Sequence, residues 1–244
     1  MLHHPTLDRL QQRRLTGMAR ALAAQAQQAD IGHLGFEERL GLLLDSEAAE
    51  RESRQNAARL KRAKLKQAAT PEDVDFRHPR GLDRALLTRL MAGDWVKAHP
   101  NVLVCGPTGV GKTFLACALA NQACRQGHSV LYVRLPRLLP ALALGRHDGS
   151  YAKTLAQMAR TDVLVIDDWG LAPLTDEGRR DLLEIVDDRH GCRSTIITSQ
   201  LPVPHWHAAI GDPTLADAIL DRLVHQAHCL NLDGESLRKK GKPA

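Results

Sequence analysis

The stretch that decides the fold of this chain reads Gly106-Pro107-Thr108-Gly109-Val110-Gly111-Lys112-Thr113. It matches the pattern G-x-x-x-x-G-K-[ST], with a short apolar segment (101–105) before it and a helical pattern (112–126) after it. Glycines allow backbone N–H groups to turn inward around an anion, and the N-terminus of the following helix adds partial positive charge. The stretch therefore predicts a phosphate-binding loop in a nucleotide-binding domain.

Two side chains of this loop are expected to act directly on a bound nucleotide. Lys112 can reach the outer phosphates, and the Thr113 hydroxyl can ligate Mg²⁺. The candidate nucleotide-binding residues are the whole loop and the residue that follows it, namely Gly106, Pro107, Thr108, Gly109, Val110, Gly111, Lys112, Thr113 and Phe114.

Two adjacent carboxylates follow the apolar run 163–166. A buried strand that ends in acids directs them toward the ligand crevice of a parallel sheet. We expect Asp167 to hold Mg²⁺ and Asp168 to orient the attacking water. Asp167-Asp168-Trp169-Gly170 also fits the D-x-x-G pattern of GTPases, but the sequence has no N-K-x-D guanine-reading motif, so ATP is the favoured nucleotide.

From residue 101 onward, apolar segments alternate with helical patterns. The expected strands cover 101–105, 129–134, 162–167, 194–199 and 228–232. This alternation predicts an α/β fold with a five-stranded parallel sheet that helices cover on both faces. The preceding sequence predicts one helix over 6–29 and a second helix that begins after Gly35, so we expect a small α-helical N-terminal domain (1–69) before an ATPase domain (70–244).

Positive charge is concentrated in the N-terminal part of the chain. The net charge is +5, and the stretch 51–66 holds seven basic residues against one acid. On a helix, five of these share an arc of about 140°, and such a strip suits the phosphate backbone of nucleic acid. The candidate DNA contacts are Arg51, Arg54, Arg59, Arg62 and Lys66; a solvated helix face or a basic linker is the alternative.

Several longer stretches carry a family resemblance. They are the phosphate loop, 36–44, 80–84, 196–202, 211–223 and 234–238. Through these the chain resembles the IstB family, the helper ATPases encoded beside the transposase of bacterial insertion sequences. That family is related to the DnaC-type helicase loaders of the AAA+ class, and the likeness covers nearly the whole chain.

The resemblance implies roles for three further residues. Gln200 ends the strand that carries the first sensor, where loader relatives place Asn; Thr198 and Ser199 are alternatives for this role. Arg222 is implied as an arginine finger that acts on ATP held by a neighbouring subunit, and Arg238 as a second sensor. Asp168 stands where many AAA+ proteins carry Glu, which is consistent with the initiator and loader branch and leaves both fast and slow hydrolysis open.

The resemblance also implies a function. It points to a Mg²⁺-dependent ATPase that oligomerises on duplex DNA, hydrolyses ATP at subunit interfaces and recruits and stimulates its cognate transposase. A replicative helicase loader and, more weakly, a P-loop small-molecule kinase are the alternatives. No apolar run approaches the roughly 20 residues of a membrane span, and the scattered cysteines and the N-terminal sequence lead us to expect a cytoplasmic protein.

Overall fold

A computed structural model describes residues 5–237 of the chain. Contacts within the chain divide it into two compact units, Met1–Ala58 and Arg59–Ala244. The division falls inside helix α3 (Phe36–Ala63), so the end of this helix belongs with the second unit. The functional boundary at 69/70 stays a prediction.

The first unit is helical. It contains α1 (Pro5–Gln12), α2 (Thr16–Gln25), the 3-10 helix η1 (Ala29–His33) and most of α3. The single helix expected over 6–29 is interrupted, because Arg14 adopts a left-handed backbone conformation with φ of 60°. Helix α2 lies close against α3: a Cβ on Gly17 would come within 2.4 Å of the Ser46 carbonyl oxygen.

The second unit is built on one parallel sheet. Its strands are β1 (Val102–Cys105), β2 (Val130–Arg134), β3 (Val163–Trp169), β4 (Ser194–Ser199) and β5 (His228–Asn231). Within residues 5–237 the five strands lie in the order β2-β3-β4-β1-β5, and every neighbouring pair is parallel. The prediction of a five-stranded parallel α/β sheet is confirmed.

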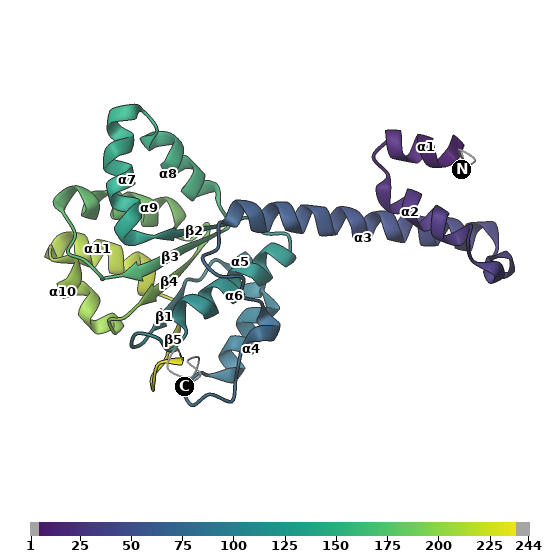
Figure 1. Ribbon diagram of the computed structural model, residues 1–244. Coiled ribbons are helices and arrows are strands. Elements are labelled where there is room, and N and C mark those ends of the chain that lie inside the picture. The colour runs from purple at the N-terminus through teal and green to yellow at the C-terminus, as the bar shows by residue number, and fades with distance from the viewer. Residues whose placement is uncertain (1–4, 238–244) are drawn as a thin grey trace, which may run out of the picture. The chain divides into compact units, whose positions relative to one another are not determined.

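Helices cover both faces of this sheet (Figure 1). One face carries α4 (Arg84–Ala92), α5 (Asp94–Ala98) and α6 (Lys112–Arg125). The other carries α7 (Leu135–Asp148), α8 (Tyr151–Arg160), α9 (Asp176–Arg189), α10 (Trp206–Ile210) and α11 (Pro213–Val224). Strand β1 shows why two cores form: Val102 and Val104 enter one core, whereas Leu103 and Cys105 enter the other.

The segment between α3 and α4 belongs to the core beside α6. Ala63 and Ala69 are fully buried there, and Val74, just after the 3-10 helix η2 (Pro71–Asp73), is nearly so. These small and apolar residues fix the path of the chain past the start of α6. As a result, two residues of this segment, Lys66 and Gln67, line the cavity at the phosphate loop.

The apolar stretch 82–95 forms two helices, α4 and α5, because Gly93 between them has φ of 92° and closes α4. Among residues 5–237, no helix combines the length and the apolar character needed to cross a bilayer.

Candidate functional site

The predicted phosphate loop connects the end of β1 to the start of α6. Gly109 and Gly111 have φ of 91° and 97°, a region that favours glycine. A Cβ on Gly109 would come within 2.1 Å of the Ser236 Oγ, and one on Gly111 within 2.6 Å of Arg80 Nη1. Glycine is required at both positions, for conformation and for space.

Arg80 holds the loop through a hydrogen bond to its backbone. It is 2% exposed, and its guanidinium donates to the carbonyl oxygens of Val110 (3.1 Å) and Asp75 (3.0 Å). Burial lowers the pKa of Arg80. The family resemblance includes Arg80 in the stretch 80–84 but implies no role for it. Its contact with the loop is seen only in the three-dimensional structure.

Lys112, the first residue of α6, folds back over the loop. Its Nζ donates to the carbonyl oxygens of Gly106 (2.6 Å) and Pro107 (2.7 Å). The side chain therefore lies across the loop itself, close to where an anion bound by the loop amides would sit.

The carboxylate of Asp167 is surrounded by three hydroxyl donors and one lysine. It is fully buried in β3, and Thr113 Oγ1 donates to its Oδ1 at 2.9 Å. The hydroxyls of Tyr132 and Thr198 also donate to this carboxylate, and Lys66 Nζ lies 3.4 Å from Oδ2.

These partners determine the charge state of Asp167. Burial alone raises its pKa, but the hydrogen bonds from Thr198, Tyr132 and Thr113 and the charge of Lys66 outweigh burial and hold the pKa below its ordinary value of 3.8. Burial, reinforced by Asp167, raises the pKa of Tyr132, so the phenol stays a donor. The carboxylate is therefore ionised at neutral pH.

Asp168 leaves the regular strand geometry. The register of β3 against β4 shifts between Ile166 and Trp169, and Asp168 has φ of 64°. This bulge re-aims the side chain of Asp168 out of the sheet. Its carboxylate forms an ion pair with Arg134, the last residue of β2.

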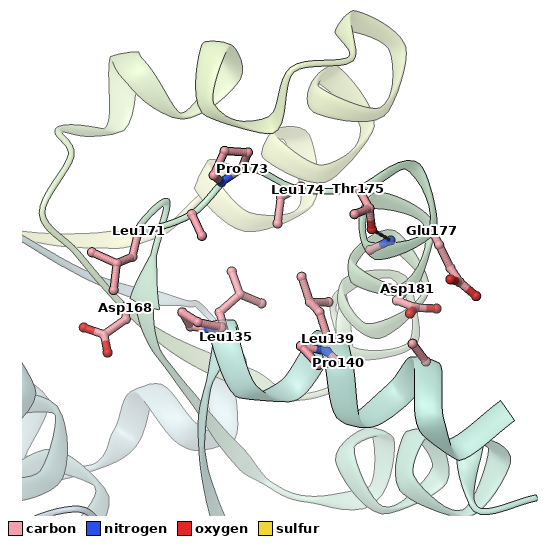
Figure 2. Close-up of a pocket in the computed structure, with 14 residues that line it drawn as sticks. Leu135, Leu139, Pro140, Asp168, Leu171, Pro173, Leu174, Thr175, Glu177 and Asp181 are labelled. Atoms are coloured by element: carbon pink, nitrogen blue, oxygen red, sulfur yellow. Dashed lines mark hydrogen bonds between the residues drawn. The ribbon is translucent and has the colours of Figure 1, made fainter. Parts of the chain in front are cut away.

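Asp168 forms part of the walls of two cavities. One is the phosphate cavity, and the other is an apolar cavity of about 340 Å³ between α7 and α9. Figure 2 shows Leu135, Leu139 and Leu174 lining the apolar cavity, with the carboxylate of Asp168 at one end and directed away from it. The acid thus lies between the phosphate loop and an apolar hollow.

The phosphate cavity, of about 280 Å³, brings together several residues of the predicted nucleotide site. It is lined by Lys66, Gln67, Thr108, Gly109, Gly111, Lys112, Thr113, Phe114, Asp168, Gln200 and Leu237. Gln200 reaches the loop, because Thr108 Oγ1 donates to its amide oxygen at 2.8 Å. Leu237 N donates to Gly109 O, so the chain passes the loop just before Arg238, which lies outside the described residues.

The groups that line this cavity, together with the buried Asp167 beside Thr113 and Lys66, fit a nucleotide with Mg²⁺. Thr113 and Asp167 offer a hydroxyl and a carboxylate within hydrogen-bond distance of each other, and magnesium prefers such oxygen ligands. The loop amides, the start of α6 and Lys112 supply the positive potential that a polyphosphate requires.

Arg222 lies elsewhere. It lines a separate cavity of about 300 Å³, and its guanidinium pairs with Asp187. Asn101, which precedes β1, donates to the carbonyl oxygens of Arg222 and Leu223, each at 3.1 Å. Arg222 is therefore near the N-terminal end of β1, whereas the phosphate loop follows its C-terminal end.

The predicted basic strip is divided in the structure. Arg51 and Arg54 belong to the first unit, where they pair with Glu47. In the second unit Arg59 donates to Cys124 O at 2.8 Å, Arg62 is exposed, and Lys66 faces Asp167. Within the second unit, Arg59 and Lys66 therefore have partners of their own, and a DNA contact by the strip stays a prediction.

A basic hollow in the first unit includes two arginines that sequence reasoning missed. It is a shallow depression lined by Arg13, Arg14, Arg51, Arg54, Gln55 and Ala58. The left-handed turn at Arg14 ends α1 and brings this doublet toward α3. The signal in the sequence was the adjacent pair Arg13-Arg14 itself, within a pattern interpreted as continuous helix.

The strand order, the phosphate loop after β1 and the paired acids at the end of β3 define a P-loop protein with the AAA+ fold. The chain belongs to the IstB family: residues 8–244 match the family described as IstB-like ATP binding protein. It is 56% identical over 239 residues to the insertion sequence ATP-binding protein y4pL of Sinorhizobium fredii, covering 98% of both chains. It is 54% identical to the IS1162 ATP-binding protein of Pseudomonas fluorescens, covering 83% of this chain and 88% of the relative.

Solved structures show the same fold. The crystal structure of DnaI aligns with a TM-score of 0.60 at 23% identity, over 68% of this chain and 91% of that chain. The DnaC helicase loader aligns with a TM-score of 0.52 at 22% identity, over 60% of this chain and 85% of that chain. The replication initiator DnaA bound to AMPPCP and single-stranded DNA aligns with a TM-score of 0.58 at 15% identity, over 70% of this chain and 52% of that chain.

Proposed function

We propose that this protein is an ATP-hydrolysing, DNA-binding helper of transposition whose active site is completed by a second copy of the chain. The observation that carries the proposal is the separation of Arg222 from the phosphate cavity. The relatives named as insertion sequence ATP-binding proteins support the biological setting.

In this proposal the phosphate cavity binds ATP. The loop amides and Lys112 hold the phosphates, and Thr113 and Asp167 would hold Mg²⁺, which would supply charge neutralisation at the transferred phosphoryl group. Asp168 orients and polarises the attacking water. Gln200 lies beside the loop through Thr108 and places an amide where it can bond the terminal phosphate or that water.

Arg222 acts on the nucleotide of a neighbouring subunit. In its own chain it lines a different cavity and lies beyond the opposite end of β1, so it cannot serve the ATP that its own loop holds. An arginine supplied in trans stabilises transition-state charge and makes hydrolysis depend on assembly. The homo-oligomer is therefore part of the proposal.

Duplex DNA is the proposed polymer partner of the first unit. The basic hollow presents the guanidinium groups of four arginines, so binding is expected to be driven by phosphates and to have little sequence preference. Arg51 and Arg54 remain candidate contacts from the predicted strip, with Arg13 and Arg14 added. The insertion-sequence setting makes the cognate transposase the proposed protein partner.

The test is the ATPase rate per protomer measured against protein concentration, with and without duplex DNA. The rate per protomer should rise with concentration and rise further with DNA, because both promote the shared site. A constant rate from dilute monomer, unchanged by DNA, would contradict the proposal and would favour a P-loop small-molecule kinase.

A replicative helicase loader is the second candidate, favoured by the shared fold with DnaI and DnaC. Its main partner would be a protein ring rather than a transposase. Affinity purification from cells that carry both partners distinguishes the two, since a loader should retain the helicase and a transposition helper should retain the transposase.

A further inference from the structure

Lys66 lies in the phosphate cavity and not on an open helix face. The sequence pattern groups it with the basic strip, but α3 ends at Ala63 and Lys64 adopts a left-handed conformation with φ of 53°. This turn removes Lys66 from the helical arc. Its Nζ lies 3.4 Å from Asp167 Oδ2, and the residue lines the same cavity as Lys112 and Thr113.

The position of Lys66 is fixed by the core around it. Ala63 and Ala69 are fully buried on either side, and Leu65 packs against the same core. Near the end of α3, Arg59 donates to Cys124 O in α6 at 2.8 Å. The segment is therefore attached to the helix that follows the phosphate loop, and the lysine side chain crosses from it to the site.

The charges around Lys66 indicate which ligand it serves. Asp167 is also the carboxylate that would hold Mg²⁺, so the ammonium group and the metal compete for the same ligand. A polyphosphate brings several negative charges into a cavity where Lys66, 37% exposed, keeps a flexible stem able to turn toward them.

We propose that Lys66 is a second lysine of the nucleotide site, which neutralises Asp167 in the free protein and binds the polyphosphate when Mg²⁺ takes that carboxylate. This inference rests on the proposed function of the cavity as an ATP site. It assigns to Lys66 a binding role in place of the DNA contact that its sequence position predicts.

The experiment measures binding of a fluorescent ATP analogue and of duplex DNA separately for each variant. Lys66→Met removes the charge and keeps the length of the side chain, Lys66→Arg keeps the charge, and Lys61→Met removes an exposed lysine of α3 that does not line the cavity. Thermal unfolding of each variant establishes that it folds. If Lys66→Met does not fold, Lys66→Gln gives the same comparison.

We expect Lys66→Met to weaken binding of the analogue about tenfold, as for loss of a charged hydrogen bond, while Lys66→Arg and Lys61→Met stay within about threefold of the unchanged protein. DNA affinity measured without nucleotide should be the same for all of them. Unchanged nucleotide affinity in Lys66→Met, or a loss confined to DNA binding, would overturn the inference. Failure of the unchanged protein to bind the analogue would instead refute the proposed function.

Discussion

Arg134 holds one oxygen of the Asp168 carboxylate: its Nε lies 2.8 Å and its Nη2 2.6 Å from Oδ2. Arg134 is the last residue of β2, and the next residue, Leu135, begins α7 and lines the apolar cavity. The ion pair therefore links the proposed catalytic acid to the helix that forms one wall of that cavity. An acid held in this way has a lone pair less available to an attacking water.

Replacing Arg134 by Met should release Asp168. We expect ATP hydrolysis without DNA to rise about threefold or more, because the oxygen that Arg134 holds becomes free to bind the attacking water, and stimulation by DNA to shrink. Steady-state ATPase assays with and without duplex DNA measure both effects. Arg137→Met, an exposed arginine three residues along the chain, serves as the control. A fall in the basal rate would show instead that Arg134 is needed to position the acid.

The stability of the second unit should depend on pH through Asp167. Its pKa in the folded protein is lower than 3.8, so the ionised form contributes stability that is fully present above about pH 4 and is lost as pH falls through the folded pKa. The difference in free energy of unfolding between the unchanged protein and Asp167→Asn should be constant from neutral pH to about pH 5 and shrink below pH 4. Urea titrations at several pH values measure it. A difference that persists undiminished into the acid range would argue against this assignment.

If duplex DNA binds at the basic hollow, its affinity should depend on salt concentration through the arginines there. Each phosphate contact contributes about 0.9 to the slope of log affinity against log salt concentration. Arg13→Ala with Arg14→Ala should therefore reduce the slope for duplex DNA by about 2 and weaken binding to different sequences alike. Fluorescence anisotropy across a salt series measures the slope.

The control for the salt experiment removes two exposed cations elsewhere. Arg89 and Lys97 lie on α4 and α5, outside the hollow. Arg89→Ala with Lys97→Ala removes the same net charge and should leave the slope unchanged. Equal reductions in both double variants would indicate a general charge effect and not a contact surface.

The sheet could be predicted from the sequence because its strands are buried on both faces. Val163–Ile166 and Ile196–Ile197 read as continuous apolar runs, and each lies in a strand whose neighbours are parallel. The phosphate loop was predictable because its glycines and lysine are required at fixed spacing. The breaks between helices near Arg14 and Gly93 could not be predicted, because the apolar periodicity continues through both turns.

The surroundings of the two acids could not be predicted in the same way. Lys66 and Arg134 are remote in sequence from Asp167 and Asp168 and meet them only through the packed fold. Helical periodicity assigned Lys66 to the basic strip, but α3 ends at Ala63, so Lys66 lies beyond the helix. The bulge that turns Asp168 outward depends on the register of β3 against β4.

The most direct test of a shared active site mixes two inactive variants. Asp168→Asn should bind ATP and not hydrolyse it, and Arg222→Ala should lack the group that it supplies to its neighbour. In a one-to-one mixture on duplex DNA, ATP held by an Arg222→Ala subunit can meet Arg222 of an Asp168→Asn subunit, so the rate should recover to about a quarter of that of the unchanged protein. A mixture no more active than the average of the two separate variants would contradict a site built from two subunits.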